Sequence, residues 1–134
     1  MKLIYFLLLY CGLPCISYSQ DSTVTFRSNL FRTFYKEKGE DTMKQTEASF
    51  TSHLILFDRI KKRILVYDKK KQFELNILDN KPKEQSKNIE SFHFACIDIA
   101  TLTECTVSLR FFEDKPFSFE IDFGNLKIQY FLEE

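Results

Sequence analysis

The sequence predicts an all-β fold, an antiparallel meander of seven or eight strands that forms a small barrel or a sandwich. Apolar and polar residues alternate along several short segments, which is the period of half-buried strands. Short turn-forming segments separate these strands, and almost no part of the chain has a helical period. Only 3 of the 134 residues are Gly and 3 are Pro, so long disordered tracts are not expected.

The first 19 residues have the three regions of a secretory signal peptide. Lys2 carries the positive charge, residues 3–13 form a short apolar run, and Ser17 and Ser19 give a small-x-small ending. Because the run is much shorter than the roughly 20 residues of a membrane-spanning helix, we expect cleavage before Gln20.

Residues 20–134 are then expected to be a single all-β domain, periplasmic or secreted, without a transmembrane segment. A lipid anchor on Cys11 is the less favoured alternative, because bulky Tyr10 stands where a lipoprotein signal has a small residue. Basic and acidic side chains number 19 each in the whole chain. This balance gives no reason to expect nucleic-acid binding.

The segments near the start of the domain are predicted from their patterning. A first strand lies between Val24 and Phe34, and the polar residues 36–50 form a loop or one short helix around Thr42 to Ala48. A later strand is predicted where Phe73, Leu75 and Ile77 alternate with polar residues, followed by a loop over residues 79–90.

Two strands between these segments are apolar on both faces. Residues 54–57 and 64–67 consist entirely of Leu, Ile, Val, Phe and Tyr, and they flank a charged turn over 58–62. Such strands are buried on both sides or covered by a partner.

A hairpin with one apolar face is predicted around the two cysteines of the mature chain. Placing Cys96 opposite Cys105 sets Phe94 opposite Val107 on the same face. Directly opposed residues of an antiparallel pair have Cα atoms about 4.5–5.5 Å apart, which a disulfide can bridge. Because exported proteins meet oxidising conditions, we expect a Cys96–Cys105 disulfide.

The C-terminal segment predicts a second hairpin. Gly124 and Asn125 form a two-residue turn, so that Phe119 lies opposite Tyr130, and Asp122 lies opposite Lys127 on the other face. Turn chemistry and face pattern therefore agree.

Four short segments follow one another in the order Phe57-Asp58, Ile64-Leu65-Val66-Tyr67, Cys96-Ile97-Asp98 and Cys105-Thr106-Val107. In these residues and their order the chain resembles small exported bacterial all-β proteins of unassigned function. The resemblance covers most of residues 50–131 and supplies no catalytic residue.

Charge is unevenly distributed along the domain. Residues 59–87 carry ten basic and four acidic side chains, whereas residues 88–134 carry three basic and nine acidic ones. Because alternate turns of a meander share one end, six basic residues are candidates for a pole that faces an anionic surface or ligand. Solvated turns and protected sheet edges are the favoured alternative explanation for the lysines. The six are Arg59, Lys61, Lys62, Lys81, Lys83 and Lys87.

The sequence offers little for catalysis or metal binding. His93 and Cys96 point to opposite faces of a regular strand, which argues against a shared zinc site. His93 lies beside Ser108, but we find neither a nucleophile elbow nor an orienting acid for the pair. No cofactor is expected, and Glu120 with Asp122 are the neatest carboxylate pair, on the solvent face of a strand.

We therefore expect a non-enzymatic exported β-module that binds a protein partner or a small ligand. Inhibition of an extracellular hydrolase is one alternative role, and a carboxylate-dependent hydrolase is a less favoured one. Two convergent acids in a pocket would favour the hydrolase, whereas an apolar cavity or patch would favour binding.

Overall fold

The computed structural model describes residues 23–133, which contain ten strands and no helix. The expected signal peptide over residues 1–19 lies outside the described residues. The strands are β1 (Thr23–Tyr35), β2 (Lys44–Gln45), β3 (Ser49–Asp58), β4 (Arg63–Tyr67), β5 (Lys71–Asn80), β6 (Glu84–Ser86), β7 (Ile89–Asp98), β8 (Thr103–Phe112), β9 (Lys115–Asp122) and β10 (Leu126–Leu132).

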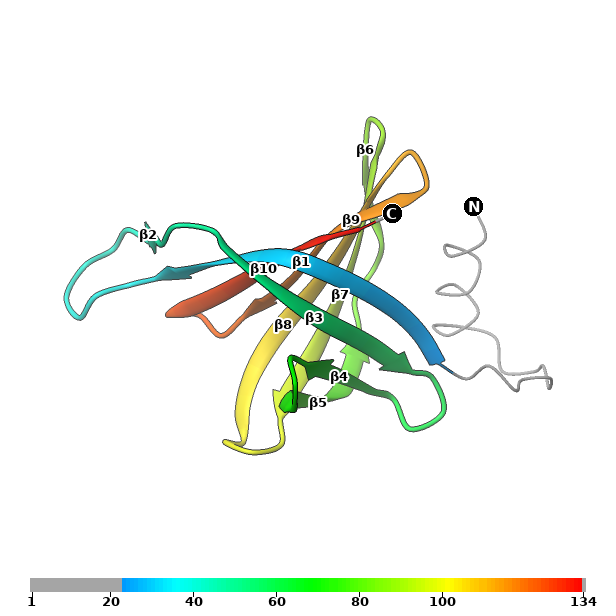
Figure 1. The fold of residues 1–134 in the computed structure, drawn as a ribbon, viewed down its shortest axis with the longest axis horizontal. Coiled ribbons are helices and arrows are strands. Elements are labelled where there is room, and N and C mark those ends of the chain that lie inside the picture. The colour runs from blue at the N-terminus through cyan, green and yellow to red at the C-terminus, as the bar shows by residue number, and fades with distance from the viewer. Residues whose placement is uncertain (1–22, 134) are drawn as a thin grey trace.

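Eight of these strands form a closed antiparallel barrel (Figure 1). The order is β1, β3, β4, β5, β7, β8, β9 and β10, and β10 pairs again with β1. The meander that the sequence predicts is therefore confirmed, and the structure chooses the barrel over the sandwich. β2 and β6 are short additional strands that pair with β1 and β7.

The two predicted hairpin registers are confirmed. Cys96 lies opposite Cys105 and Phe94 opposite Val107 in the β7–β8 pair. Phe119 lies opposite Tyr130 in the β9–β10 pair. Gly124 has a φ of +97° in the turn of the second hairpin, a conformation that glycine adopts without steric cost.

Two polar segments differ from the expectation. No helix forms around Thr42 to Ala48, because Lys44 and Gln45 pair as β2 with the end of β1. The predicted loop over residues 79–90 contains β6, which pairs with the start of β7. Both strands are too short to show an alternating pattern in the sequence.

β1 closes the barrel and also extends beyond β3. Its pairings with β3 and β10 both shift register between Ser28 and Leu30, where a bulge bends the strand. The second half of β1 stays paired with β10, and its end, with β2 beside it, projects to the left in Figure 1.

Aromatic side chains fill the barrel interior. The Phe57 ring on β3 packs against Phe94 on β7 and Phe119 on β9, with ring centroids 5.7 and 5.9 Å apart. These contacts cross the barrel, because β3 pairs with neither β7 nor β9. The Phe119 ring also meets Tyr130, which closes the packed cluster.

Among the described residues, no helix is long and apolar enough to cross a membrane.

Replacing Phe119 by Ala should lower the free energy of unfolding by about 3–5 kcal/mol, because it removes a fully buried ring and leaves a cavity. Urea unfolding measures this loss. Leu102→Ala is the control, because Leu102 is 72% exposed and its truncation should change stability by less than about 0.5 kcal/mol. Equal effects of the two substitutions would contradict the packed interior.

Candidate functional site

The candidate surfaces lie on the outside of the barrel, because its interior is occupied by side chains. Residues that alternate with the buried core on β7, β8, β9 and β10 form an outer wall of polar groups. Ser108 and Ser118 on this wall are 6% and 1% exposed, although they face away from the core. The wall is therefore a close-fitted polar layer.

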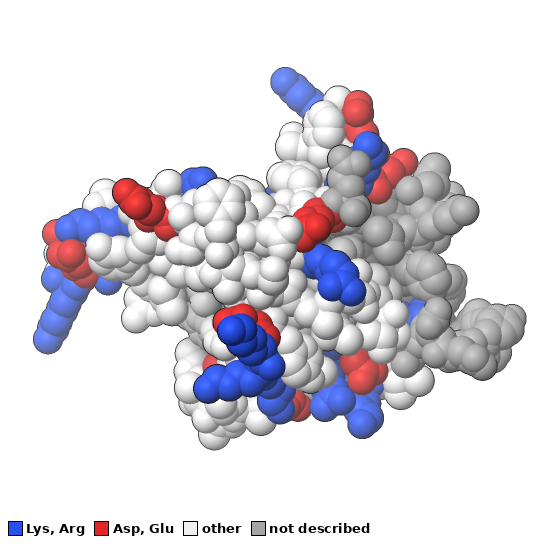
Figure 2. Space-filling model, viewed as in Figure 1, with Lys and Arg blue, Asp and Glu red and all other residues white. Residues whose placement is uncertain are grey.

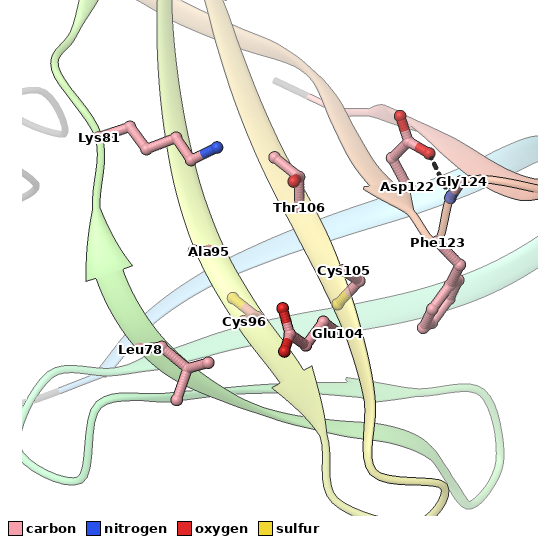
Figure 3. A pocket seen from close by; sticks show the side chains of 10 residues that line it. All are labelled: Leu78, Lys81, Ala95, Cys96, Glu104, Cys105, Thr106, Asp122, Phe123 and Gly124. Atoms are coloured by element: carbon pink, nitrogen blue, oxygen red, sulfur yellow. Dashed lines mark hydrogen bonds between the residues drawn. The ribbon is translucent and has the colours of Figure 1, made fainter.

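A shallow groove of about 390 Å³ crosses the outer wall over β7, β8 and β9 (Figure 3). Lys81 reaches across β7 towards Thr106, and Glu104 and Asp122 lie further along. Asp122 turns away from Glu104, because its Oδ1 accepts a hydrogen bond of 2.8 Å from the Gly124 N–H. The two carboxylates therefore do not converge on one point.

The two cysteines lie side by side beneath the groove. Both are buried, at 1% exposed for Cys96 and 7% for Cys105. Both are free thiols, so the structure describes the reduced state of the pair and not the disulfide expected from the sequence. The pairing in register places them at the separation that a disulfide bridges.

Burial makes both thiols weak acids. It raises the pKa of Cys96 from 9.0 to about 12, and the neighbouring Cys105 adds to this shift. Burial likewise raises the pKa of Cys105 from 9.0 to about 11, with further contributions from Asp98 and Asp122. Because the thiolate is the nucleophile, neither cysteine is prepared for nucleophilic catalysis at neutral pH.

A hydrogen-bonded chain joins three side chains on the outer wall. His93 Nε2 donates to Glu84 Oε1 at 3.1 Å, and His93 Nδ1 lies 2.8 Å from Ser108 Oγ. The sequence predicts the His93–Ser108 neighbour pair correctly but gives no sign of the acid. Glu84 is brought in by β6, whose pairing with β7 the sequence did not reveal.

This order of groups matches a serine–histidine–acid triad, but its surroundings do not match a hydrolase site. Ser108 lies in the middle of β8, opposite His93 on one side and Glu120 on the other. The backbone N–H groups around it belong to two ladders and cannot form an oxyanion hole. The hydrogen bonds from Glu84 through His93 to Ser108 therefore link β6 to the outer wall of the barrel.

The six basic residues of the predicted pole do not form one cluster. Arg59, Lys61 and Lys62 lie in the turn between β3 and β4, at the lower right of Figure 1, whereas the β6 hairpin with Lys87 rises at the top. Lys83 pairs with Glu90 at 3.0 Å. In Figure 2 the basic side chains are scattered over the visible face, and acidic ones lie among them.

Lys81 is the member of this set that lies on the groove. Anion binding by the set stays a prediction.

An apolar surface covers the outer face of β3 and β4. Ile55 and Phe57 point into the core, so Leu54 and Leu56 point outwards. Leu65 lies opposite Leu56 in the β3–β4 pair and is only 9% exposed, and Tyr67 lies opposite Leu54. The half-buried Leu54, Leu56 and Tyr67 provide most of the exposed apolar area of this surface. We refer to Leu54, Leu56, Leu65 and Tyr67 as the β3–β4 patch.

Two carboxylates outside the groove make hydrogen bonds or ion pairs within the barrel. Asp98 is 5% exposed and accepts hydrogen bonds from the Ala100 N–H and the Thr101 hydroxyl, which shape the β7–β8 loop. Glu120 pairs with Arg110 at 3.6 Å. Across residues 23–133, no three His, Cys, Asp or Glu side chains are grouped to hold a metal ion.

Fold and surface together define a closed eight-stranded β-barrel with a packed interior, a polar outer wall and one apolar outer face. No family model, curated protein or solved structure matches the chain.

The reduced protein should lose stability between pH 9 and 12 in a way that the disulfide-bonded form does not. Each thiol has a raised pKa in the folded state, so the unfolded chain releases its protons first and unfolding is favoured as pH rises. We expect urea unfolding to show a loss on the order of 4 kcal/mol more for the reduced form between about pH 8 and pH 10.5.

Burial also raises the pKa of Tyr130, but this contribution is common to both forms. The control is the double variant Cys96→Ala/Cys105→Ala, which should follow the oxidised protein. A parallel decline of the reduced and oxidised proteins would contradict the burial of the thiols.

Proposed function

We propose that the chain is an exported, non-enzymatic β-barrel module that binds a protein partner through the β3–β4 patch. The observation that carries this proposal is an apolar outer face on two adjacent strands whose inner faces already belong to the core. A strand that faces water is normally polar on its outer side, so apolar residues on both faces favour a covered surface.

A small ligand inside the barrel has less support than a protein partner. Rings from opposite sides of the barrel meet at its centre, and Phe57, Phe94 and Phe119 are at most 1% exposed. Ligand sites in barrels need an interior that side chains leave open. Binding to the outer surface avoids this requirement.

A carboxylate-dependent hydrolase has less support than a binding module. Such an enzyme needs two acids that face one substrate position, whereas Asp122 in the groove is held by the turn at Gly124. Inhibition of an extracellular hydrolase is one role that binding through the β3–β4 patch would serve.

We also propose that Cys96 and Cys105 are joined in the exported protein. Their opposed positions in the β7–β8 pair support this, as does the oxidising environment that the expected signal peptide implies. Two buried thiols would lose two hydrogens to an external oxidant such as a disulfide exchange partner. The crosslink would then fix the register of this hairpin.

A photo-crosslinking amino acid at Leu56 should capture the partner in the compartment to which the protein is exported. We expect a discrete adduct, seen by mass spectrometry, because Leu56 lies on the outer face of the β3–β4 patch. The same amino acid at Leu102, which is 72% exposed in the β7–β8 loop, should give no discrete adduct.

The variant Leu54→Lys in the Leu56 crosslinking background should abolish the adduct, because a charge in an apolar interface remains unpaired. Circular dichroism checks that the barrel is intact. An adduct that appears equally at Leu102, or that survives Leu54→Lys, would contradict the proposal.

A further inference from the structure

The first half of β3 has a strand on one side only. β3 pairs with β1 along Ser49–Asp58, but β4 covers only Leu54–Asp58 on the other side. Residues 49–53 therefore present backbone groups that no strand of the barrel pairs on that side. Strand edges of this kind are templates for pairing with another chain.

The most exposed large apolar side chain of the described residues lies on this edge. Phe50 is 86% exposed, more than Ile60 at 73% and Leu102 at 72%, which lie in turns. Phe50 is the second residue of β3 and lies directly before the register shift in the pairing of β3 with β1. A phenylalanine that is this exposed gains stability only when another surface covers it. Its position on the unpaired edge indicates that the covering group is another strand.

The edge also lacks the charges that usually protect such strands. Residues 48–57 contain no Lys, Arg, Asp or Glu, although charged side chains make up 28% of the whole sequence. Figure 2 shows a broad area without charged side chains over the first part of β3. Natural proteins place lysine, proline or inward charges on edges that must stay unpaired.

We propose that residues 49–51 pair with the same residues of a second copy of this chain, in an antiparallel dimer. A twofold axis beside Phe50 would place the two Phe50 side chains directly opposite each other, with Ser49 opposite Thr51 of the other copy. Uncharged residues then meet themselves without the repulsion that like charges cause across a ladder. A different partner chain that is recognised by electrostatic attraction would require charged side chains on this edge.

The backbone of the edge is able to accept a neighbouring strand. The Thr51 carbonyl accepts a hydrogen bond of 3.2 Å from His53 Nδ1, and a carbonyl oxygen has a second lone pair. The Ser52 hydroxyl donates a hydrogen bond to Asn29 Oδ1 on β1, and this contact uses none of the backbone groups of Ser52. The dimer uses residues 49–51 and not the β3–β4 patch, so it stands apart from the proposed partner binding.

Sedimentation velocity of the mature chain, residues 20–134, tests the dimer. We expect a reversible dimer that forms between about 1 and 500 µM, the range of a small interface. Phe50→Asp should weaken it at least tenfold, because two negative charges would face each other across the axis. Ile60→Asp is the matched control, since Ile60 is similarly exposed but lies in the β3–β4 turn, and it should leave the dimer unchanged.

A second variant locates the axis. Phe50→Cys should form an intermolecular disulfide under mild oxidation, whereas Ile60→Cys should not. Both variants are made with Cys96→Ala and Cys105→Ala, so that the added thiol is the sole cysteine of the mature chain. A wild-type monomer throughout the concentration range, equal effects of the two Asp variants, or equal crosslinking of the two Cys variants would each overturn the proposal.

Discussion

The pairing of β1 with β10 is the constraint on which the other features depend. An antiparallel meander leaves two unpaired edge strands unless its first and last strands meet, and here they pair over Ser28–Tyr35 and Leu126–Leu132. Closure gives the sheet one inner face, which the phenylalanines fill. The bulge beyond Ser28 bends β1, which then continues past the start of β3 while it stays paired with β10.

Closure also decides where this protein is able to bind other molecules. A barrel of eight strands has an interior just wide enough for side chains, and here aromatic rings from opposite walls are in contact. Recognition is then left to the outer wall, the turns and the parts of strands that extend beyond their neighbours. The β3–β4 patch lies on the outer face of two paired strands, and the open edge at Phe50 is part of a strand that extends beyond its neighbour.

The outer wall shows how polar side chains become buried on the outer face of a sheet. His93, Ser108 and Glu84 have the hydrogen-bond order of a catalytic triad, but both ladders of β8 already use the neighbouring backbone donors. Residues packed side by side on a pleated sheet cover one another, so Ser108 is 6% exposed on an outer face. The geometry around Ser108, and not the identity of the three residues, distinguishes a catalytic triad from hydrogen bonds that only stabilise the fold.

The sequence by itself determined the strand class and two registers, because alternation has a period of two and a one-residue slip would turn every apolar side chain outwards. That reasoning placed Cys96 opposite Cys105 and Phe119 opposite Tyr130. Only the tertiary structure decided the rest. Four features depend on pairings between distant segments. They are the closure of β10 on β1, the approach of Glu84 to His93, the separation of Lys62 from Lys87 and the missing neighbour beside Phe50. Local periodicity carries no information about such pairings, because each strand pattern fits many neighbours equally well.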